Sequence, residues 1–344
     1  MRIRGQEFGY RVVAMGGGTG LSTLLKGLKW YVATPGDPVP DKPFISQLSA
    51  VVTVSDDGGS SGRLRKEFNV LPPGDIRNCI VALSEDETLL SRLFQFRFPE
   101  NSALSGHSLG NLFLTALDQM TGNFALAVEL SSAILKTRGT ILPATTANVE
   151  VEAVMHDGSR VRGETRITAS EKRIVEFRLV PDNVRPLPQT LESIAHADMI
   201  TIGPGSLFTS LASSLLVSGI VDAICSSPAV KVFVCNLMTE ANESLELTAS
   251  GHIRALYRVA GRPIFDFALI NDRPVPEQMA ANYAVEGAGQ IVADIAEVEA
   301  LGVTPILGDF LLSGDLARHD SDRVAAELMQ IARNNCQLPV ESHQ

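Results

Sequence analysis

One pattern occurs twice in the sequence: an apolar segment that predicts a buried strand leads directly into a turn that has almost no side chains. Residues 12–15 are apolar and lead into Gly16-Gly17-Gly18-Thr19-Gly20, and residues 199–202 lead in the same way into Gly203-Pro204-Gly205-Ser206. A bare turn between a strand and a helix lets backbone N–H groups and the positive helix end face an anion, most often phosphate. Two such turns predict a ligand whose phosphates are held from two sides.

Strand-like runs of Val and Ile alternate with helix-length segments along most of the chain. Strands are expected near residues 11–15, 49–54, 198–202, 230–236 and 267–270. Helices are expected at 21–30, 75–84, 86–97, 108–119, 123–136, 189–197, 206–217 and 243–258. This alternation is typical of an α/β fold in which helices cover both faces of a mostly parallel sheet.

Residues 148–180 break the alternation. Their apolar and polar residues alternate with period two on both sides of an Asp157-Gly158 turn, which predicts a small antiparallel β insertion. Residues 320–333 show the apolar spacing of an amphipathic terminal helix. We therefore divide the chain into residues 1–147, the insertion 148–180, the remainder of the sheet domain 181–318, and a terminal helix and tail 319–344.

Composition limits the classes of partner. The chain has 344 residues, 45% of them hydrophobic, which is enough to fill a core without disulfides. Its formal charge of −10 argues against binding a nucleic acid polymer, because phosphate-backbone affinity needs clustered Lys and Arg. Four scattered cysteines, no secretory leader and no convincing membrane span predict a cytoplasmic protein.

The second predicted strand is followed by paired carboxylates, Asp56 and Asp57, and then by a basic cluster that begins at Arg63. At the carboxyl end of a strand, carboxylates can hold a ribose hydroxyl or Mg²⁺, and nearby arginines can neutralise phosphate. The alternative is that the aspartates only form a turn and that the cations lie on a solvated helix face.

Other polar residues stand at predicted helix starts and strand ends. Asp75 suits either a helix N-cap or a metal ligand, and Arg77 in the same first turn indicates a bound anion, because cations are disfavoured there. The remaining candidates are His107, Asn111, Thr145, Thr146 and Asn236. The spacing of the Ser, His and Asp residues does not support a Ser/His/Asp catalytic triad. If the protein is an enzyme, the candidate catalytic residues are Asp56, Asp57 and His107.

Six segments together resemble the bacterial gluconeogenesis factor family, also called YvcK-like. That family is similar to 2-phospho-L-lactate transferase, the CofD enzyme of coenzyme F420 synthesis. The segments are GGGTGLS at 16–22, SDDGGSSGRLR at 55–65, LPPGDIRNC at 71–79, HSLGN at 107–111, GPGSLFTS at 203–210 and VCNLMT at 234–239. The loop GGSSGR after the aspartate pair is of the gluconeogenesis factor type.

The resemblance implies a Rossmann-like fold and a bound nucleotide. Gluconeogenesis factors look like binders of UDP-sugars such as UDP-N-acetylglucosamine, linked to cell shape and wall synthesis on gluconeogenic carbon sources, whereas the transferases use a guanosine diphosphate donor with Mg²⁺. By motif matching, 16–20 and 203–206 would face the nucleotide, and Asp56, Asp57 and Asp75 would be the positions for Mg²⁺. A homodimer and a cell-wall or metabolic protein partner are also expected.

Three functions therefore remain open. The first is a nucleotide-sugar-binding regulatory protein in which the glycine turns hold a diphosphate, Arg63 and Arg77 add charge, and Asn236 or Thr145-Thr146 contact base or sugar. The second is a Mg²⁺-dependent transferase of phosphorus-containing groups, in which the three aspartates hold the metal. The third, by fold analogy, is an NAD-type enzyme with Asp56 on the ribose.

Overall fold

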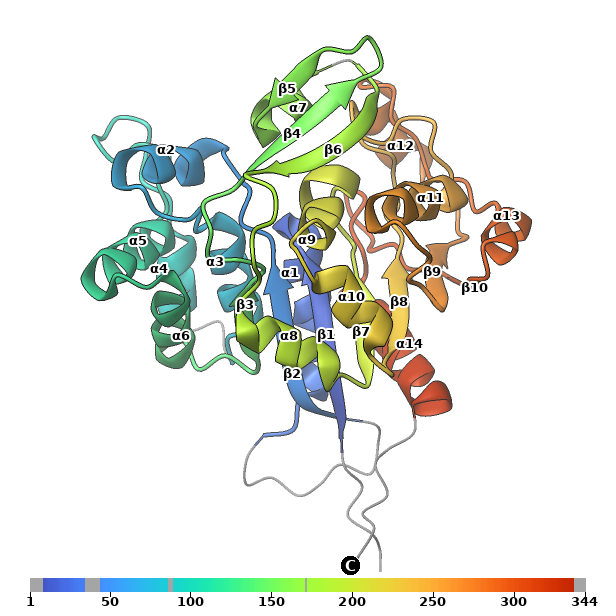
Figure 1. The fold of residues 1–344 in the computed structure, drawn as a ribbon, viewed down its shortest axis with the longest axis horizontal. Coiled ribbons are helices and arrows are strands. Elements are labelled where there is room, and N and C mark those ends of the chain that lie inside the picture. The colour runs from blue at the N-terminus through green and yellow to red at the C-terminus, as the bar shows by residue number, and fades with distance from the viewer. Residues whose placement is uncertain (1–8, 35–43, 86–88, 171, 337–344) are drawn as a thin grey trace, which may run out of the picture.

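The centre of the molecule is a parallel sheet of seven strands in the order β10-β9-β8-β7-β1-β2-β3 (Figure 1). The computed structural model describes residues 9–34, 44–85, 89–170 and 172–336. The strands are β1 (Tyr10–Gly16), β2 (Ile45–Val52), β3 (Thr140–Pro143), β7 (Met199–Ile202), β8 (Val230–Val234), β9 (Phe267–Asn271) and β10 (Thr304–Gly308).

Alternate side chains of each strand enter two separate cores, one on each face of the sheet. In β1, Val12 and Ala14 point to one core, whereas Val13 and Met15 point to the other. Because successive strand residues face opposite sides, a strand buried on both faces must be apolar throughout. This requirement explains why the strand runs carry almost no charge.

Helices cover both faces. The first core is the one that contains Val12 and Ala14. It is covered by α1 (Gly18–Leu28), α3 (Gly74–Leu83) and α14 (Ser321–Asn335), with α4 (Leu89–Gln95), α5 (Leu109–Thr121) and α6 (Phe124–Ile134) beside them. The second is closed by α8 (Pro188–Ala195), the π-helix η2 (Leu207–Ala212), α9 (Ser213–Leu215), α10 (Ile220–Ser226), α11 (Ala249–Ala260) and α13 (Ile295–Ala300). Three further helices are η1 (Lys29–Tyr31), α2 (Gly59–Phe68) and α12 (Glu277–Ala284).

The strand order reverses between β1 and β7. From β1 the chain proceeds outward to β2 and β3, and it then returns to the other side of β1 to add β7, β8, β9 and β10. The connections that follow β1 and β7 therefore lead away from each other. In open α/β sheets a ligand crevice forms at this point, beyond the carboxyl ends of the strands.

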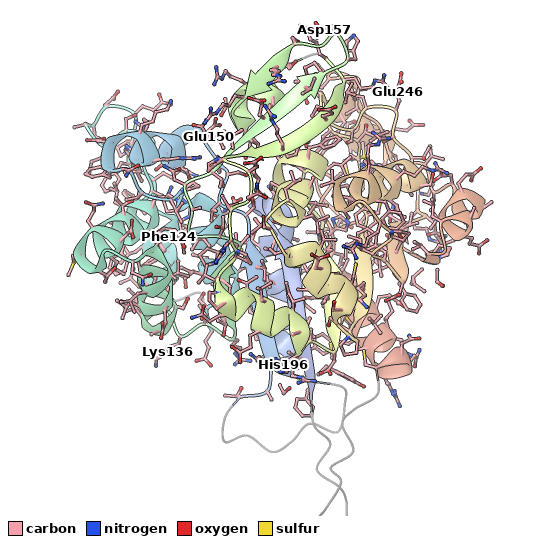
Figure 2. The ribbon with its side chains drawn as sticks, viewed as in Figure 1. Phe124, Lys136, Glu150, Asp157, His196 and Glu246 are labelled. Carbon is pink, nitrogen blue, oxygen red and sulfur yellow. The ribbon has the colours of Figure 1, made fainter. Side chains whose placement is uncertain are left out.

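The predicted insertion is present and is larger than a hairpin. It is an antiparallel sheet of β4 (Glu150–Met155), β5 (Arg160–Arg162) and β6 (Ile174–Val180), with the short helix α7 (Glu164–Thr168). Figure 1 shows it above the edge at which the central strands end, and Figure 2 labels Glu150 near its base and Asp157 at its tip.

The five predicted strands are all present, with shifted ends, and so is the terminal helix. The predicted helix 243–258 was wrong at its start, because Thr248 caps α11 through its side chain and residues before it form turns. Of the predicted helix 86–97, residues 86–88 lie outside the described residues. The elements not predicted were α2, β3, α7, α10, β10, α12 and α13.

Among the described helices, none is both long and apolar enough to cross a membrane alone. Residues Leu207–Leu215 and Ile220–Ser226 pass that test only as a pair, bent by 73°. Their apolar side chains fill the second core.

Candidate functional site

The two glycine turns lie side by side beyond the ends of β1 and β7. Gly203 N donates to Met15 O over 3.0 Å, which joins the start of one turn to the end of the other strand. A Cβ on Gly20 would stand 2.3 Å from the Pro204 carbonyl oxygen, closer than any real side chain allows. The absence of a side chain at Gly20 is what lets the turns meet.

A cavity of about 310 Å³ opens at this junction. One wall is made of the two turns, and the other comes from the segment that follows β8, from α12 and from the segment that precedes α14. The lining residues are Gly17, Gly18, Thr19, Gly20, Thr23, Pro204, Gly205, Ser206, Ser210, Asn236, Leu237, Met238, Thr239, Glu240, Tyr283, Ala317, Arg318 and His319.

The start of α1 presents unused donors to this cavity. Gly18 N donates to Asp75 Oδ2 over 2.7 Å, whereas the amides of Thr19 and Gly20 have no hydrogen-bond partner among the described residues. Gly18 has φ +61°, a conformation that glycine adopts without strain. Two free amides at the positive end of an eleven-residue helix can bind a phosphate oxygen.

The second turn differs, because the start of its helix already holds an anion. The carboxylate of Glu243 accepts from Phe208 N and from the Thr209 hydroxyl, over 3.0 and 2.8 Å. Glu243 is buried, and burial raises its pKa although these donors act in the opposite direction. A ligand phosphate therefore cannot use these groups of η2 and would meet the second turn at Ser206 instead.

Asn236, at the end of β8, holds the second turn in place. Its Oδ1 accepts from Gly205 N over 3.0 Å, and its Nδ2 donates to Gly205 O over 2.8 Å. With these two hydrogen bonds, the Asn236 side-chain amide pairs with the Gly205 backbone as a neighbouring strand would, at a point where the sheet has already ended. Asn236 thus lines the cavity and also shapes its wall.

The far wall contains residues that sequence reasoning missed. Arg318 is exposed and makes no ion pair with a described carboxylate, and Tyr283 offers an aromatic ring. His319 donates from Nε2 to Cys235 O over 3.0 Å, and burial lowers its pKa to about 4, so the ring is neutral at pH 7. Glu240 lies on the same wall, where burial and then the charge of Glu243 raise its pKa to about 7.

Carboxylates gather beside the first turn. Asp75 is partly buried, and burial followed by the charge of Asp56 raises its pKa to about 6. Glu164 of α7 reaches toward the same place, and burial together with Asp56 and Asp75 raises its pKa to about 9. Asp56 itself accepts from Gly58 N over 2.8 Å. Three carboxyl groups are thus crowded together, and at pH 7 Glu164 retains its proton.

Asp57 and Arg65 join the insertion to the sheet domain. Asp57 Oδ1 accepts from Thr165 N over 2.8 Å and from the Thr165 hydroxyl over 2.7 Å, at the start of α7. Arg65 is buried and donates to Asn148 Oδ1 over 2.8 Å and to Val149 O. The loop after β2 therefore positions the insertion over the crevice.

The other predicted cations and polar residues form a separate buried cluster between α2, α3 and α5. His107 Nδ1 lies 2.9 Å from Ser60 Oγ, which also accepts from Asn111 Nδ2 over 3.1 Å. Arg77 donates to Ser108 Oγ over 2.5 Å, and its Nε has no hydrogen-bond partner within the part of the chain that the structure describes. Burial and then Arg63 lower the pKa of His107. None of these side chains lines the cavity of the glycine turns.

Arg63, Thr145 and Thr146 also lie outside that cavity. Arg63 donates to Ser105 O over 2.5 Å, in the loop before His107. Thr145 is buried and donates to Arg185 O over 2.6 Å, whereas Thr146 is exposed. Of the predicted binding residues, the structure brings together the two glycine turns and Asn236.

No group of three or more His, Cys, Asp or Glu side chains placed to hold a metal ion occurs within the described ranges. Asp57 is engaged with Thr165, which leaves Asp56 and Asp75 as the available carboxylates near the first turn. Mg²⁺ is often held by only one or two carboxylates together with phosphate oxygens and water. The two aspartates fit a cation bound in that way.

Comparison with known proteins shows the class to which this fold and crevice belong. A family model named 2-phospho-L-lactate transferase CofD matches residues 12–311, and the chain belongs to this family. Within it, the chain is similar to proteins named gluconeogenesis factor. One, from Halalkalibacterium halodurans, is 44% identical over 93% of this chain and 95% of its own length, and one from Bacillus subtilis is 43% identical over 94% and 98%.

A solved structure agrees with the fold. The crystal structure of protein BH3568 from Bacillus halodurans superposes with a TM-score of 0.87 at 45% identity, covering 94% of this chain and all of that one. The match of family, relatives and fold confirms the sequence-based resemblance and supports a gluconeogenesis factor role.

Proposed function

We propose that this protein is a cytoplasmic regulatory protein that binds a nucleotide-sugar of the UDP-N-acetylglucosamine class at the glycine turns. One observation carries the proposal. The turns after β1 and β7 meet at the point where the strand order reverses, and they bound a cavity into which the free amides of Thr19 and Gly20 open. Arg318 faces the same space, so a diphosphate there meets donors from two sides.

The rest of the wall supports a ligand larger than an inorganic anion. The Tyr283 ring gives a surface for a base or a sugar, and the Ser206 hydroxyl can bond a sugar hydroxyl. A volume near 310 Å³ is in the range of small-ligand sites. In this proposal the protein acts as a homodimer, and a cell-wall or metabolic protein responds to the bound state.

A Mg²⁺-dependent transfer reaction is the second candidate, and the pair Asp56 and Asp75 favours it. Two carboxylates that repel each other next to a phosphate-binding turn are stabilised by a cation. When bound, Mg²⁺ would neutralise the phosphates of a guanosine diphosphate donor and its leaving group. Gly18 N, which donates to Asp75, fixes the orientation of that carboxylate toward the turn.

The first test is the identity of any nucleotide that copurifies with the protein, read by mass spectrometry. It is followed by thermal unfolding with UDP-N-acetylglucosamine, a guanosine diphosphate donor with Mg²⁺, and NADH. A ligand that binds only the folded state raises the unfolding temperature with its concentration. The proposal expects a rise with the UDP-sugar that does not need Mg²⁺ and no consumption of ligand.

Other outcomes point elsewhere. A rise with the guanosine donor and Mg²⁺, together with its turnover in the presence of the acceptor Fo, favours the transferase. A rise with NADH alone favours the dinucleotide enzyme. No shift with any phosphate-containing ligand would remove the proposal.

A further inference from the structure

A contiguous flank of the molecule, made of α4, α5 and α6, exposes an unusual share of the apolar side chains. Among the described residues, nineteen large apolar side chains are exposed, and nine of these lie between residues 89 and 134. They are Leu89, Leu90, Leu93, Phe96, Leu104, Met120, Leu126, Leu130 and Ile134. Exposed apolar surface gathered in this way marks an interaction site.

On α6 the exposed residues form a row. Leu126, Leu130 and Ile134 are spaced by four residues, so they lie one above the other along the helix, and they are 38%, 38% and 44% exposed. Figure 2 labels Phe124 and Lys136 near the two ends of this helix, at the side of the molecule. Rows of this spacing are the ridges that pack into the grooves of another helix.

The flank continues into a free edge of the central sheet. Strand β3 is the last in the strand order and, among the described strands, pairs only with β2. A groove of about 460 Å³ runs between β3 and α6, lined among others by Leu126 and Glu129, and the buried Ser132 hydroxyl beside it has no hydrogen-bond partner. An uncovered sheet edge exposes unpaired backbone groups, which natural proteins usually protect.

Charge is scarce on this flank. Residues 89–134 contain only Arg92, Arg97, Glu100, Asp118 and Glu129, five charged residues in 46 or about 11%, whereas charged residues make up 20% of the whole chain. Interface cores are depleted of charge in the same way. Two strongly acidic molecules repel each other over most of their surface, and this flank is where they can approach.

We propose that the α4–α6 flank is the contact surface between two copies of this chain. A two-fold interface uses the same patch on both partners, so it needs a patch that is apolar, nearly neutral and self-complementary. The α6 row can pack on its own symmetry copy, and β3 can face the β3 edge of the partner. The flank carries too few charges to attract a partner of opposite charge, which favours a second copy of this chain as the partner.

The available area is sufficient. The nine exposed side chains together present roughly 900 Å², because a large apolar side chain offers about 200 Å² when free. A stable interface needs about 800 Å² from each partner, only part of it apolar. The flank can therefore supply a stable dimer without a rearrangement of the fold.

The test measures the mass of the full chain by light scattering and sedimentation over a wide dilution series. The native protein is expected to show the mass of two chains, and Leu130→Glu the mass of one. A charge at this position faces its own copy across the axis, so the dissociation constant should rise by at least ~100-fold. The matched control is Leu312→Glu, because Leu312 is 46% exposed but lies outside the flank, and it should stay a dimer.

Circular dichroism and the unfolding temperature show whether Leu130→Glu is folded, and Ile134→Lys repeats the test with the opposite charge. A native chain that stays single at every concentration would overturn the proposal. So would a folded Leu130→Glu or Ile134→Lys that remains dimeric. Because no ligand enters the measurement, its failure is separate from failure of the proposed nucleotide-sugar binding.

Discussion

Gly18 and Gly20 are glycines for different reasons within one turn. Gly20 has no room for a Cβ, which would meet the backbone of Pro204, whereas Gly18 has only Ser210 Oγ at 3.9 Å but a positive φ. A substitution at Gly20 should therefore disturb the meeting of the two turns. A substitution at Gly18 costs backbone strain and places its side chain beside the free amides, so it is the better probe of binding.

We expect Gly18→Val to remain folded and to lose the thermal shift produced by a nucleotide-sugar. The strain of a non-glycine residue at this φ is on the order of 1–2 kcal/mol. Gly302→Ala is the control, since Gly302 has φ +78° and nothing within 4 Å of a Cβ, far from the cavity. If Gly18→Val binds as well as the control, the amides of α1 are not the phosphate site.

We expect Asn236→Asp to weaken both stability and binding. The substitution replaces the donor to Gly205 O with a carboxylate oxygen, so one hydrogen bond becomes a repulsion, at a cost of about 1–3 kcal/mol. Chemical unfolding gives the stability, and titration with a nucleotide-sugar gives the affinity. An unchanged affinity would show that the shape of the second turn does not matter to the ligand.

The sequence located both glycine turns and Asn236 because their chemistry is local. It could not locate Arg318, Tyr283 or Glu240, since these reach the cavity only through long-range packing. The same limit affects Arg77. Its position in a helix's first turn indicated an anion, but the structure places its guanidinium on Ser108, in a cluster that does not line the cavity.

At the level of elements, the insertion is held at the start of α7, where the Asp57 carboxylate binds Thr165. We expect Asp57→Ala to increase hydrogen exchange in residues 148–180 while the sheet domain keeps its protection, because loss of such a cap costs about 0.5–2 kcal/mol. Asp182→Ala, at an exposed position, is the control. Unchanged exchange in the insertion would show that Asp57 does not hold it.

Helices and strands whose residues show a clear hydrophobic pattern were predicted from the sequence, and those without such a pattern were not. The strands β1, β7, β8 and β9 stood out because both of their faces are buried. Helix α2 has two glycines and two serines in its first four residues, so its propensity is low and it depends on packing of Leu64 and Arg65. Strands β3 and β10 lie at the two edges of the sheet and each contains a proline, and β10 is only partly buried, so neither shows the continuous apolar run of the predicted strands.

At the level of the whole molecule, raised carboxyl pKa values make stability depend on pH. A folded state that holds a proton more tightly than the unfolded chain is stabilised below the unfolded pKa and loses that stability as pH rises through the folded pKa. Asp75 loses it between its ordinary pKa of 3.8 and pH 6, Glu240 between 4.5 and 7, and Glu164 between 4.5 and 9. We therefore expect the unfolding temperature to fall from pH 5 to pH 9.

Glu164→Gln should flatten this profile over its whole range from pH 5 to pH 9. The amide cannot ionise, so the variant should gain on the wild type throughout the rise from pH 5 to pH 9, by about 2 °C or more, and match its slope only below pH 4, where Glu164 is protonated in both states. Glu299→Gln, at an exposed position on α13, should follow the wild type throughout. Parallel profiles for all three proteins would show that Glu164 does not carry the effect.

In the whole molecule, the reversal of strand order at β1 and β7 brings the two glycine turns together, and the insertion lies above them. Calorimetric titration of UDP-N-acetylglucosamine into the native protein and into Gly18→Val tests this most directly. We predict binding of one ligand per chain without added Mg²⁺, and its loss in the variant. Equal heats for both proteins, or none for the native chain, would contradict the account.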